Sequence, residues 1–103
     1  MEHRYNNLNA LVKDIENWAC ATFPHANNYS LLSHLAEEYD ELVKACKSGC
    51  GINDEIADCL FLLIHLAKIN NLSIYRLLCK KLNINLNRDW SGKPDANGVV
   101  HHK

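Results

Sequence analysis

Two short acidic clusters each contain a pair of carboxylates spaced i, i+3, within an apolar stretch that has the pattern of a helix. On an α-helix such residues share a face and lie roughly 4.5 Å apart along the axis, so each pair can offer two carboxylate oxygens to the same ion. Two such pairs on antiparallel helices can coordinate a hard cation such as Mg²⁺ or Mn²⁺. The cation keeps open coordination positions for water and phosphate oxygens. The pattern predicts phosphate-ester or phosphoanhydride chemistry, with the metal ligands Glu38, Glu41, Glu55 and Asp58.

The alternative for each cluster is a solvated helix face, which is the usual setting of Glu and Asp. The surroundings argue against it. Glu38 interrupts an apolar stripe at helical spacing, made of Leu31, Leu35, Leu42 and Ala45. Asp58 precedes the apolar run 59–64, and no lysine or arginine occurs between residues 47 and 68 to compensate a buried charge. The two clusters together favour a metal site.

Length and charge limit the function. A chain of 103 residues predicts one domain, residues 1–103, with a modest core. The net charge of −1 provides no basic field for polymeric nucleic acid or an anionic membrane. The N-terminus lacks an apolar signal core and the longest apolar run is too short to span a bilayer, so we expect a cytoplasmic protein.

Cysteine usage agrees with this expectation. The five cysteines are an odd number scattered through helical segments, which indicates buried, reduced thiols instead of a disulfide framework. Cys46 and Cys50 could share a helix face, but no second Cys/His pair at zinc spacing accompanies them. A zinc site is therefore disfavoured.

Apolar periodicity predicts four helices, over about residues 5–21, 29–47, 53–69 and 73–87. Asn53 and Ser73 are the expected N-caps of the third and fourth helices, and Gly49 lies in a glycine-rich stop after the second. The tail, residues 89–103, consists mostly of residue types that favour turns, and no strand pattern is present in the sequence. The expected fold is an all-α antiparallel four-helix bundle with an irregular C-terminal tail.

The apolar surface of the predicted third helix indicates self-association. The run from Cys59 to Ile64 leaves no polar face for water, and three partner helices from so short a chain cannot easily cover it. A two-fold interface would bury the same patch twice, so we expect a homodimer or homotetramer. The alternative is a well-packed monomer.

The fourth helix adds candidate phosphate ligands. Lys81, Asn85 and Arg88 fall at i, i+4 and i+7, so one face carries a compact cation, an amide and a planar guanidinium fork. Basic residues near a helix C-terminus also complement the helix dipole, which is the ordinary alternative.

Two tryptophans and two histidines are further candidates. Trp18 and Trp90 are candidates for contact with a nucleobase, although such residues more often pack in a core or an interface. His34 and His65 are expected to be hydrogen-bonded interior or cleft-edge histidines, because nearer carboxylates would ligate a metal first.

The order and spacing of these motifs resemble the MazG-like branch of the all-α nucleoside triphosphate pyrophosphohydrolases. The matching pattern is EExxE at 37–41, a 13-residue gap, ExxD at 55–58, and then KxxxNxxR at 81–88. Further likeness to a small single-domain subgroup is found at Trp18 through Phe23-Pro24, at His34-Leu35 and at Pro94-Asp95-x-x-Gly98. The resemblance thus covers nearly the whole chain.

The resemblance implies Mg²⁺-dependent cleavage of a (d)NTP to the monophosphate and pyrophosphate, with Mn²⁺ as a possible substitute. It implies that the four paired carboxylates hold the metal, that the fourth-helix residues face the phosphates, and that the enzyme is a dimer or a dimer of dimers. Such an enzyme would serve house-cleaning or control of the dNTP pool. The chain departs from the family pattern at Asp54, an extra carboxylate beside Glu55, and at Val100, where an acidic residue often stands.

The expected mechanism is metal-assisted hydrolysis, in which a water oriented by Glu37 or Glu38 attacks the α-phosphorus. The chain shows no Ser-His-Asp pattern, Walker loop or Glu-x-x-His pair. The alternative function is a catalytically silent helical module that binds a nucleotide or a protein. The pattern is compatible with any base and with either sugar.

Overall fold

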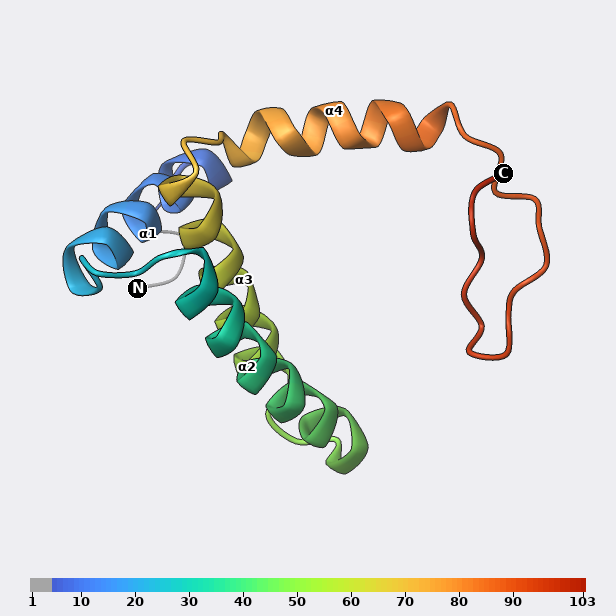
Figure 1. Cartoon of the computed structure of the whole chain (residues 1–103), viewed down its shortest axis with the longest axis horizontal. Coiled ribbons are helices and arrows are strands. Elements are labelled where there is room, and N and C mark those ends of the chain that lie inside the picture. The colour runs from blue at the N-terminus through green and yellow to red at the C-terminus, as the bar shows by residue number, and fades with distance from the viewer. Residues whose placement is uncertain (1–4) are drawn as a thin grey trace.

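The computed structural model describes residues 5–103 and contains four α-helices (Figure 1). They are α1 (Leu8–Thr22), α2 (Asn28–Ser48), α3 (Ile52–Ile69) and α4 (Ile74–Leu86). The described residues contain no strand, and the segment after α4 is irregular. The predicted all-α class, the four helices and the irregular tail are confirmed.

Side-chain caps fix three of the helix starts. The Asn7 side chain accepts a hydrogen bond from the backbone N–H of Ala10 at 2.9 Å, so α1 begins at Leu8 instead of Tyr5. Asn27 and Ser30 form a reciprocal capping box at the start of α2. Ser73 caps α4, as predicted.

The turn between α2 and α3 corrects the predicted start of α3. Gly49 and Gly51 both have a left-handed backbone, with φ of 77° and 79°. This conformation suits glycine and allows the chain to reverse within three residues. Helix α3 therefore begins at Ile52, directly after Gly51, and the prediction of Asn53 as its N-cap is wrong.

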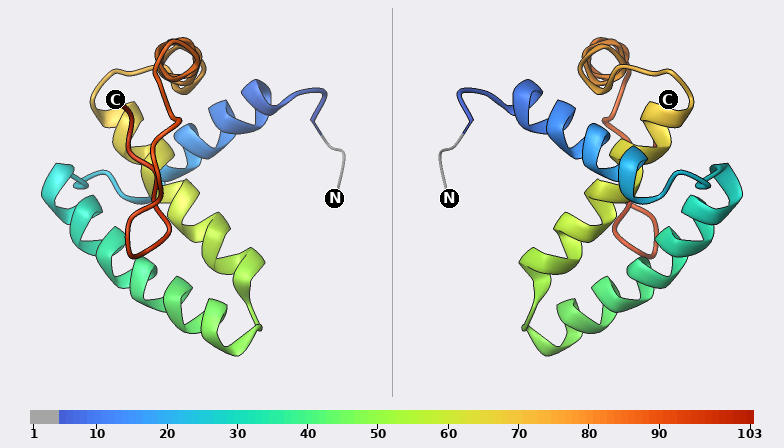
Figure 2. Two further views of the ribbon diagram at one scale, coloured as in Figure 1. Left: turned by 90° about the vertical axis from the view of Figure 1, so that its right-hand side faces the viewer. Right: turned by 90° about the vertical axis from the view of Figure 1, so that its left-hand side faces the viewer.

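The packed part of the molecule consists of α1, α2 and α3. Helices α2 and α3 form an antiparallel hairpin, and α1 packs across α3 near the end remote from that turn (Figure 2). The buried apolar residues are few and mostly small: Ile15, Ala19, Leu31, Ala45 and Ala67. The apolar stripe predicted along α2 faces this core, since Leu31 and Ala45 are buried and Glu38 lies between them half-buried.

The position of α4 differs from the antiparallel four-helix bundle that the sequence predicts. Among the described residues, the substantial helix contacts are α2 with α3 and α1 with α3, and α4 extends away as an arm (Figure 1). The radius of gyration is 16.2 Å, against about 13 Å for a compact domain of this length. At the junction with α3 the axis bends by 102°, and Asn71 adopts a positive φ of 59° in the connecting turn.

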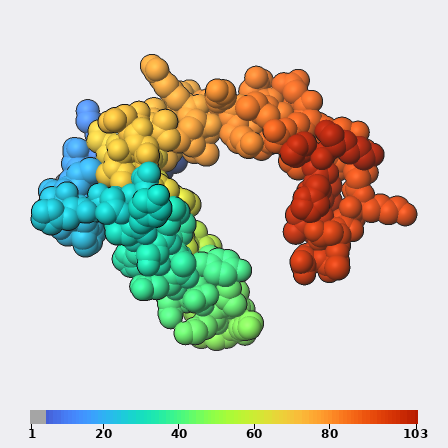
Figure 3. Space-filling model, in the orientation of Figure 1, coloured from blue at the N-terminus to red at the C-terminus, as the bar shows by residue number. Residues whose placement is uncertain are grey.

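The arm carries an apolar stripe that none of the other helices in residues 5–103 covers. Tyr75, Leu78, Leu82 and Leu86 are 57–74% exposed and recur at helical spacing. The predicted apolar run on α3 is also only partly covered, because Leu60 remains 52% exposed and Leu63 43%. The space-filling view shows the arm and tail curving away from the α1–α3 body (Figure 3). These faces agree with the predicted self-association without showing it.

The tail after α4 forms a closed loop. Asp95 accepts hydrogen bonds from the backbone N–H groups of Asn97 and Val99, and its other oxygen lies 3.0 Å from His101 Nε2. Trp90 anchors the loop to the arm, because its indole N–H donates to the Asn85 carbonyl at 2.7 Å.

Two further observations concern the chain as a whole. All five cysteines are unpaired, as expected, but the prediction that they are buried is wrong: Cys20 and Cys59 are half-buried and the other three are exposed. Within the described residues no individual helix has the length and apolar character to cross a membrane; α3 and α4 reach both only when taken together, across their sharp bend.

Candidate active site

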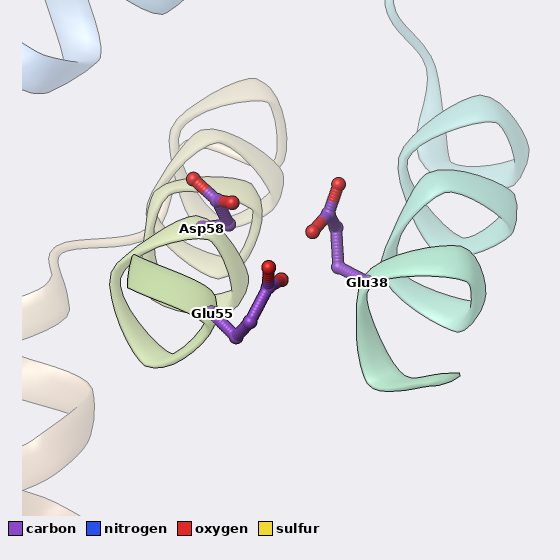
Figure 4. A group of neighbouring side chains, drawn as sticks. All are labelled: Glu38, Glu55 and Asp58. Carbon is purple, nitrogen blue, oxygen red and sulfur yellow. The ribbon is translucent and has the colours of Figure 1, made fainter. Parts of the chain in front are cut away.

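Three carboxylates from two helices converge beside the α2–α3 hairpin. Glu38 projects from α2, and Glu55 and Asp58 project from successive turns of α3 toward it (Figure 4). One oxygen from each lies within 4.8 Å of the others. The i, i+3 spacing on α3 and the antiparallel pairing of the helices therefore bring together three of the four predicted metal ligands.

This cluster holds more negative charge than its surroundings compensate. Within residues 5–103, no lysine or arginine forms an ion pair with these three carboxylates. Burial is the largest cause that raises the pKa of Glu55 above its ordinary value. The hydrogen bond and the charge of Glu38 raise it further, and the charge of Asp58 adds to the effect. Burial and the same three carboxylates also raise the pKa of the Cys59 thiol.

The cluster fits a divalent cation. Its donors are all carboxylate oxygens, which hard cations prefer, and Glu55 Oε2 is buried without a hydrogen-bond partner. A bound cation would supply that partner and remove the repulsion that raises the pKa of Glu55. Because the cluster is only partly buried, it also leaves access for water and a substrate.

The other acidic residues of the two motifs lie outside the group. Glu41 is exposed one turn beyond Glu38, and its Oε1 accepts a hydrogen bond from Lys44 Nζ at 3.3 Å. Its charge nevertheless contributes to the raised pKa of Glu55, so it lies at the edge of the cluster. Glu37 and Asp54 are both exposed.

A pocket of about 580 Å³ adjoins the carboxylates. Glu38 and Asp58 line one part of it, and the aromatic rings of Trp18, Phe23 and Phe61 line another. The Trp18 ring meets the other two edge to face, at centroid distances of 5.7 and 5.9 Å. The structure therefore places Trp18 beside the carboxylate cluster, in a cavity with room for a planar ring.

The remaining predicted substrate-binding residues lie elsewhere in this chain. Lys81 and Asn85 are on the α4 arm, Arg88 and Trp90 follow it, and none of them lines the pocket. Asn85 Oδ1 is buried without a hydrogen-bond partner. Within one chain, the carboxylates and the residues predicted to bind the phosphates do not form one site.

Sequence reasoning missed part of the pocket. Thr22, the last residue of α1, and the connection from Phe23 to Ala26 form one wall. On α3, Phe61, Leu62 and His65 follow Asp58 at i+3, i+4 and i+7, a spacing that could have identified them as sharing its face.

The two histidines differ in environment. His34 is exposed and its Nε2 lies 3.4 Å from Glu38 Oε1, so it is a cleft-edge histidine, as predicted. His65 is interior, also as predicted, but its Nε2 has no hydrogen-bond partner among the described residues.

Comparison with known proteins identifies the family. The MazG nucleotide pyrophosphohydrolase domain matches residues 26–83, more than half of the chain, including both acidic motifs. Among curated proteins there is no match. Among solved structures, the chain is similar to the cyanophage S-2L MazG-like pyrophosphohydrolase bound to dGDP and three catalytic Mn²⁺ ions per active site, with a TM-score of 0.77, 26% sequence identity, and coverage of 96% of this chain and 99% of that chain. The chain therefore belongs to the MazG nucleotide pyrophosphohydrolase domain family and is a hydrolase of nucleotide phosphoanhydrides.

Proposed function

We propose that this enzyme hydrolyses nucleoside triphosphates, ribo- or deoxyribo-, to the monophosphate and pyrophosphate with Mg²⁺. The observation that carries the proposal is the group of three carboxylates within 4.8 Å at the side of a 580 Å³ pocket. The site would hold the ion through Glu38, Glu55 and Asp58, with Glu41 joining once it leaves Lys44. Mn²⁺ would substitute, since both ions take oxygen ligands and the cyanophage relative binds Mn²⁺.

Each group of residues has a part in the reaction. When bound, the cation supplies positive charge that neutralises the phosphate oxygens. Glu37 or Glu38 orients a water and accepts its proton as the water oxygen bonds to the α-phosphorus. The bond from the α-phosphorus to the bridging oxygen breaks, and pyrophosphate leaves with that oxygen. Trp18 and its neighbouring rings exclude water and receive the base.

The triphosphate needs cations that this pocket does not supply. No lysine or arginine lines it, and the described residues place Lys81 and Arg88 on or just beyond the α4 arm. We propose that the arm of a second copy brings Lys81, Asn85 and Arg88 to the phosphates. There the side-chain amide N–H of Asn85 would donate a hydrogen bond to a phosphate oxygen.

The chemistry of the arm favours a second copy as its partner. Its stripe of large apolar side chains is exposed, and so is much of the apolar run on α3. An arm that packs on another copy buries both surfaces. By two-fold symmetry the arm of that copy packs on the first in the same way, which gives a homodimer or a dimer of dimers. Trp90, held against Asn85, would move with the arm and lie near the base or the interface.

The test is product analysis. The purified protein is incubated with the four NTPs and four dNTPs plus Mg²⁺, and pyrophosphate, monophosphate and orthophosphate are followed separately. Pyrophosphate and monophosphate in equal amounts are expected, at a rate lost in EDTA and restored by Mg²⁺ or Mn²⁺. Orthophosphate with a diphosphate would refute cleavage at the α-phosphorus. Nucleotide binding without any hydrolysis would instead favour a silent binding module.

A further inference from the structure

His65 lies on the same face of α3 as the carboxylate cluster, at the other end of the pocket. It follows Asp58 by seven residues, which is two helical turns or about 10 Å along the axis. Phe61 and Leu62, one turn from each, line the pocket between them. A nucleotide whose phosphates lie at the carboxylates would therefore extend its sugar and base along this face toward His65.

The imidazole of His65 is buried and incompletely bonded. The residue is 3% exposed, and Nε2 has no hydrogen-bond partner in the described part of the chain. Burial lowers the pKa of His65, so the ring is neutral near pH 7 and offers Nε2 as a donor or an acceptor according to its tautomer. An unpaired polar atom in such a position destabilises the free protein and gains a partner if a ligand reaches it.

The Phe23 ring lies next to the His65 ring. Their ring centroids are 6.3 Å apart. Phe23 is 48% exposed and follows the last residue of α1, in the connection to α2. Because it is half-exposed and lies outside a helix, its side chain can turn toward solvent if it gives up its edge-to-face contact with Trp18, whereas the helix holds His65 in place.

We propose that His65 is a specificity-determining residue: its Nε2 hydrogen-bonds to the polar edge of the nucleobase once the Phe23 ring turns aside. This inference rests on the proposed triphosphate hydrolysis. Aromatic stacking alone accepts every base, because each has a π face. A buried hydrogen-bonding atom distinguishes bases by the group on their edge, since a mismatched base leaves that atom unpaired.

The test compares His65→Leu with His65→Gln. Leucine has a similar size without a polar atom, whereas the glutamine amide can place a donor or acceptor near Nε2. For the preferred base, His65→Leu should lower kcat/KM about ten- to hundredfold, mainly through KM. For the other bases the change should be small, so discrimination falls. His65→Gln should keep more of the discrimination than His65→Leu. Without nucleotide, His65→Leu should melt at a higher temperature than wild type, because the unpaired atom is gone.

Binding provides a second readout that does not need turnover. The histidine ring ¹⁵N resonances are recorded in EDTA as each of the four deoxynucleoside monophosphates is added, with His65 assigned from the His65→Gln spectrum. The preferred base should shift the His65 Nε2 resonance more than the others do. This measurement also serves if His65→Leu does not fold.

The possible failures are distinguishable. If the wild type hydrolyses no nucleotide but its His65 resonance reports the base, the proposed function fails and the base contact stands. A wild type that treats all bases alike would overturn the inference while leaving hydrolysis intact. So would a His65→Leu variant with unchanged preference, or an Nε2 resonance that does not move when backbone amide shifts show saturation.

Discussion

Removing one charge from the carboxylate cluster should stabilise the metal-free protein and disable the enzyme. Asp58→Asn keeps the shape of the side chain and removes a charge held within 4.8 Å of the oxygens of Glu38 and Glu55. In the absence of metal the variant lacks the repulsion of Asp58 with the other two carboxylates, so it should unfold at a higher temperature than wild type. With metal the order should reverse, because an amide is a poorer ligand than a carboxylate.

The size of the effect follows from the spacing. At 4.8 Å, the upper limit of the separations within the group, Coulomb repulsion between two carboxylates is about 0.9 kcal/mol in water and about 3.5 kcal/mol at an effective dielectric constant of 20. Asp58 is exposed, which favours the lower value. For a domain of this size, about 1 kcal/mol corresponds to a rise in Tm of roughly 4–8 °C. Mg²⁺ at about 100 times its Kd should stabilise wild type by about 2.7 kcal/mol and the variant much less.

The assay pairs thermal unfolding with pyrophosphate release, each in EDTA and in Mg²⁺. Turnover by Asp58→Asn should fall by at least about 100-fold, more than the usual cost of losing a residue that only orients a metal ligand. Asp54→Asn is the matched control, because Asp54 lies on the same helix, is exposed and lies outside the group of three. If Asp54→Asn lost activity and the Mg²⁺ response while Asp58→Asn kept both, the assignment of the ligands would be refuted.

Three further predictions concern the arm and the tail. Arg88→Lys keeps the charge but loses the planar fork, so kcat/KM should fall about tenfold while the Mg²⁺-induced Tm shift is unchanged; equal loss of both would make Arg88 structural. Wild type should sediment as a dimer or tetramer across dilution, and Leu82→Asp, at an exposed position of the arm, should dissociate it and reduce activity; a fully active 11.7 kDa particle would contradict this. Hydrogen bonds from His101 and from two backbone N–H groups lower the pKa of Asp95. The order they give the tail should therefore be present above the ordinary carboxyl pKa and lost as the pH falls through the lowered value; a protection factor of the Val99 amide against hydrogen exchange that stays constant on acidification would oppose it.

Local sequence signals predicted the helices well and their ends less well. The positions of α2, α3 and α4 follow from apolar periodicity, and Ser73 and Gly49 were recognisable as boundaries because capping depends on a few adjacent residues. Asn53 was wrongly chosen as a cap, because two left-handed glycines allow a shorter turn than its side chain suggested. The cap at Asn7 was not predicted, because several asparagines near the start of α1 offer the same side chain.

The sequence by itself determined the chemistry of the site, because i, i+3 spacing on a helix fixes which carboxylates share a face. It predicted Glu38, Glu41, Glu55 and Asp58 as a group, and the structure brings together all of these except Glu41. Only the tertiary structure decided what surrounds them: the pocket wall after α1, the unpaired His65, and the separation of Arg88 from the carboxylates. These depend on the angles at which helices cross and on the direction of α4, which are set by contacts between residues distant in the sequence and by apolar surface that one chain leaves uncovered.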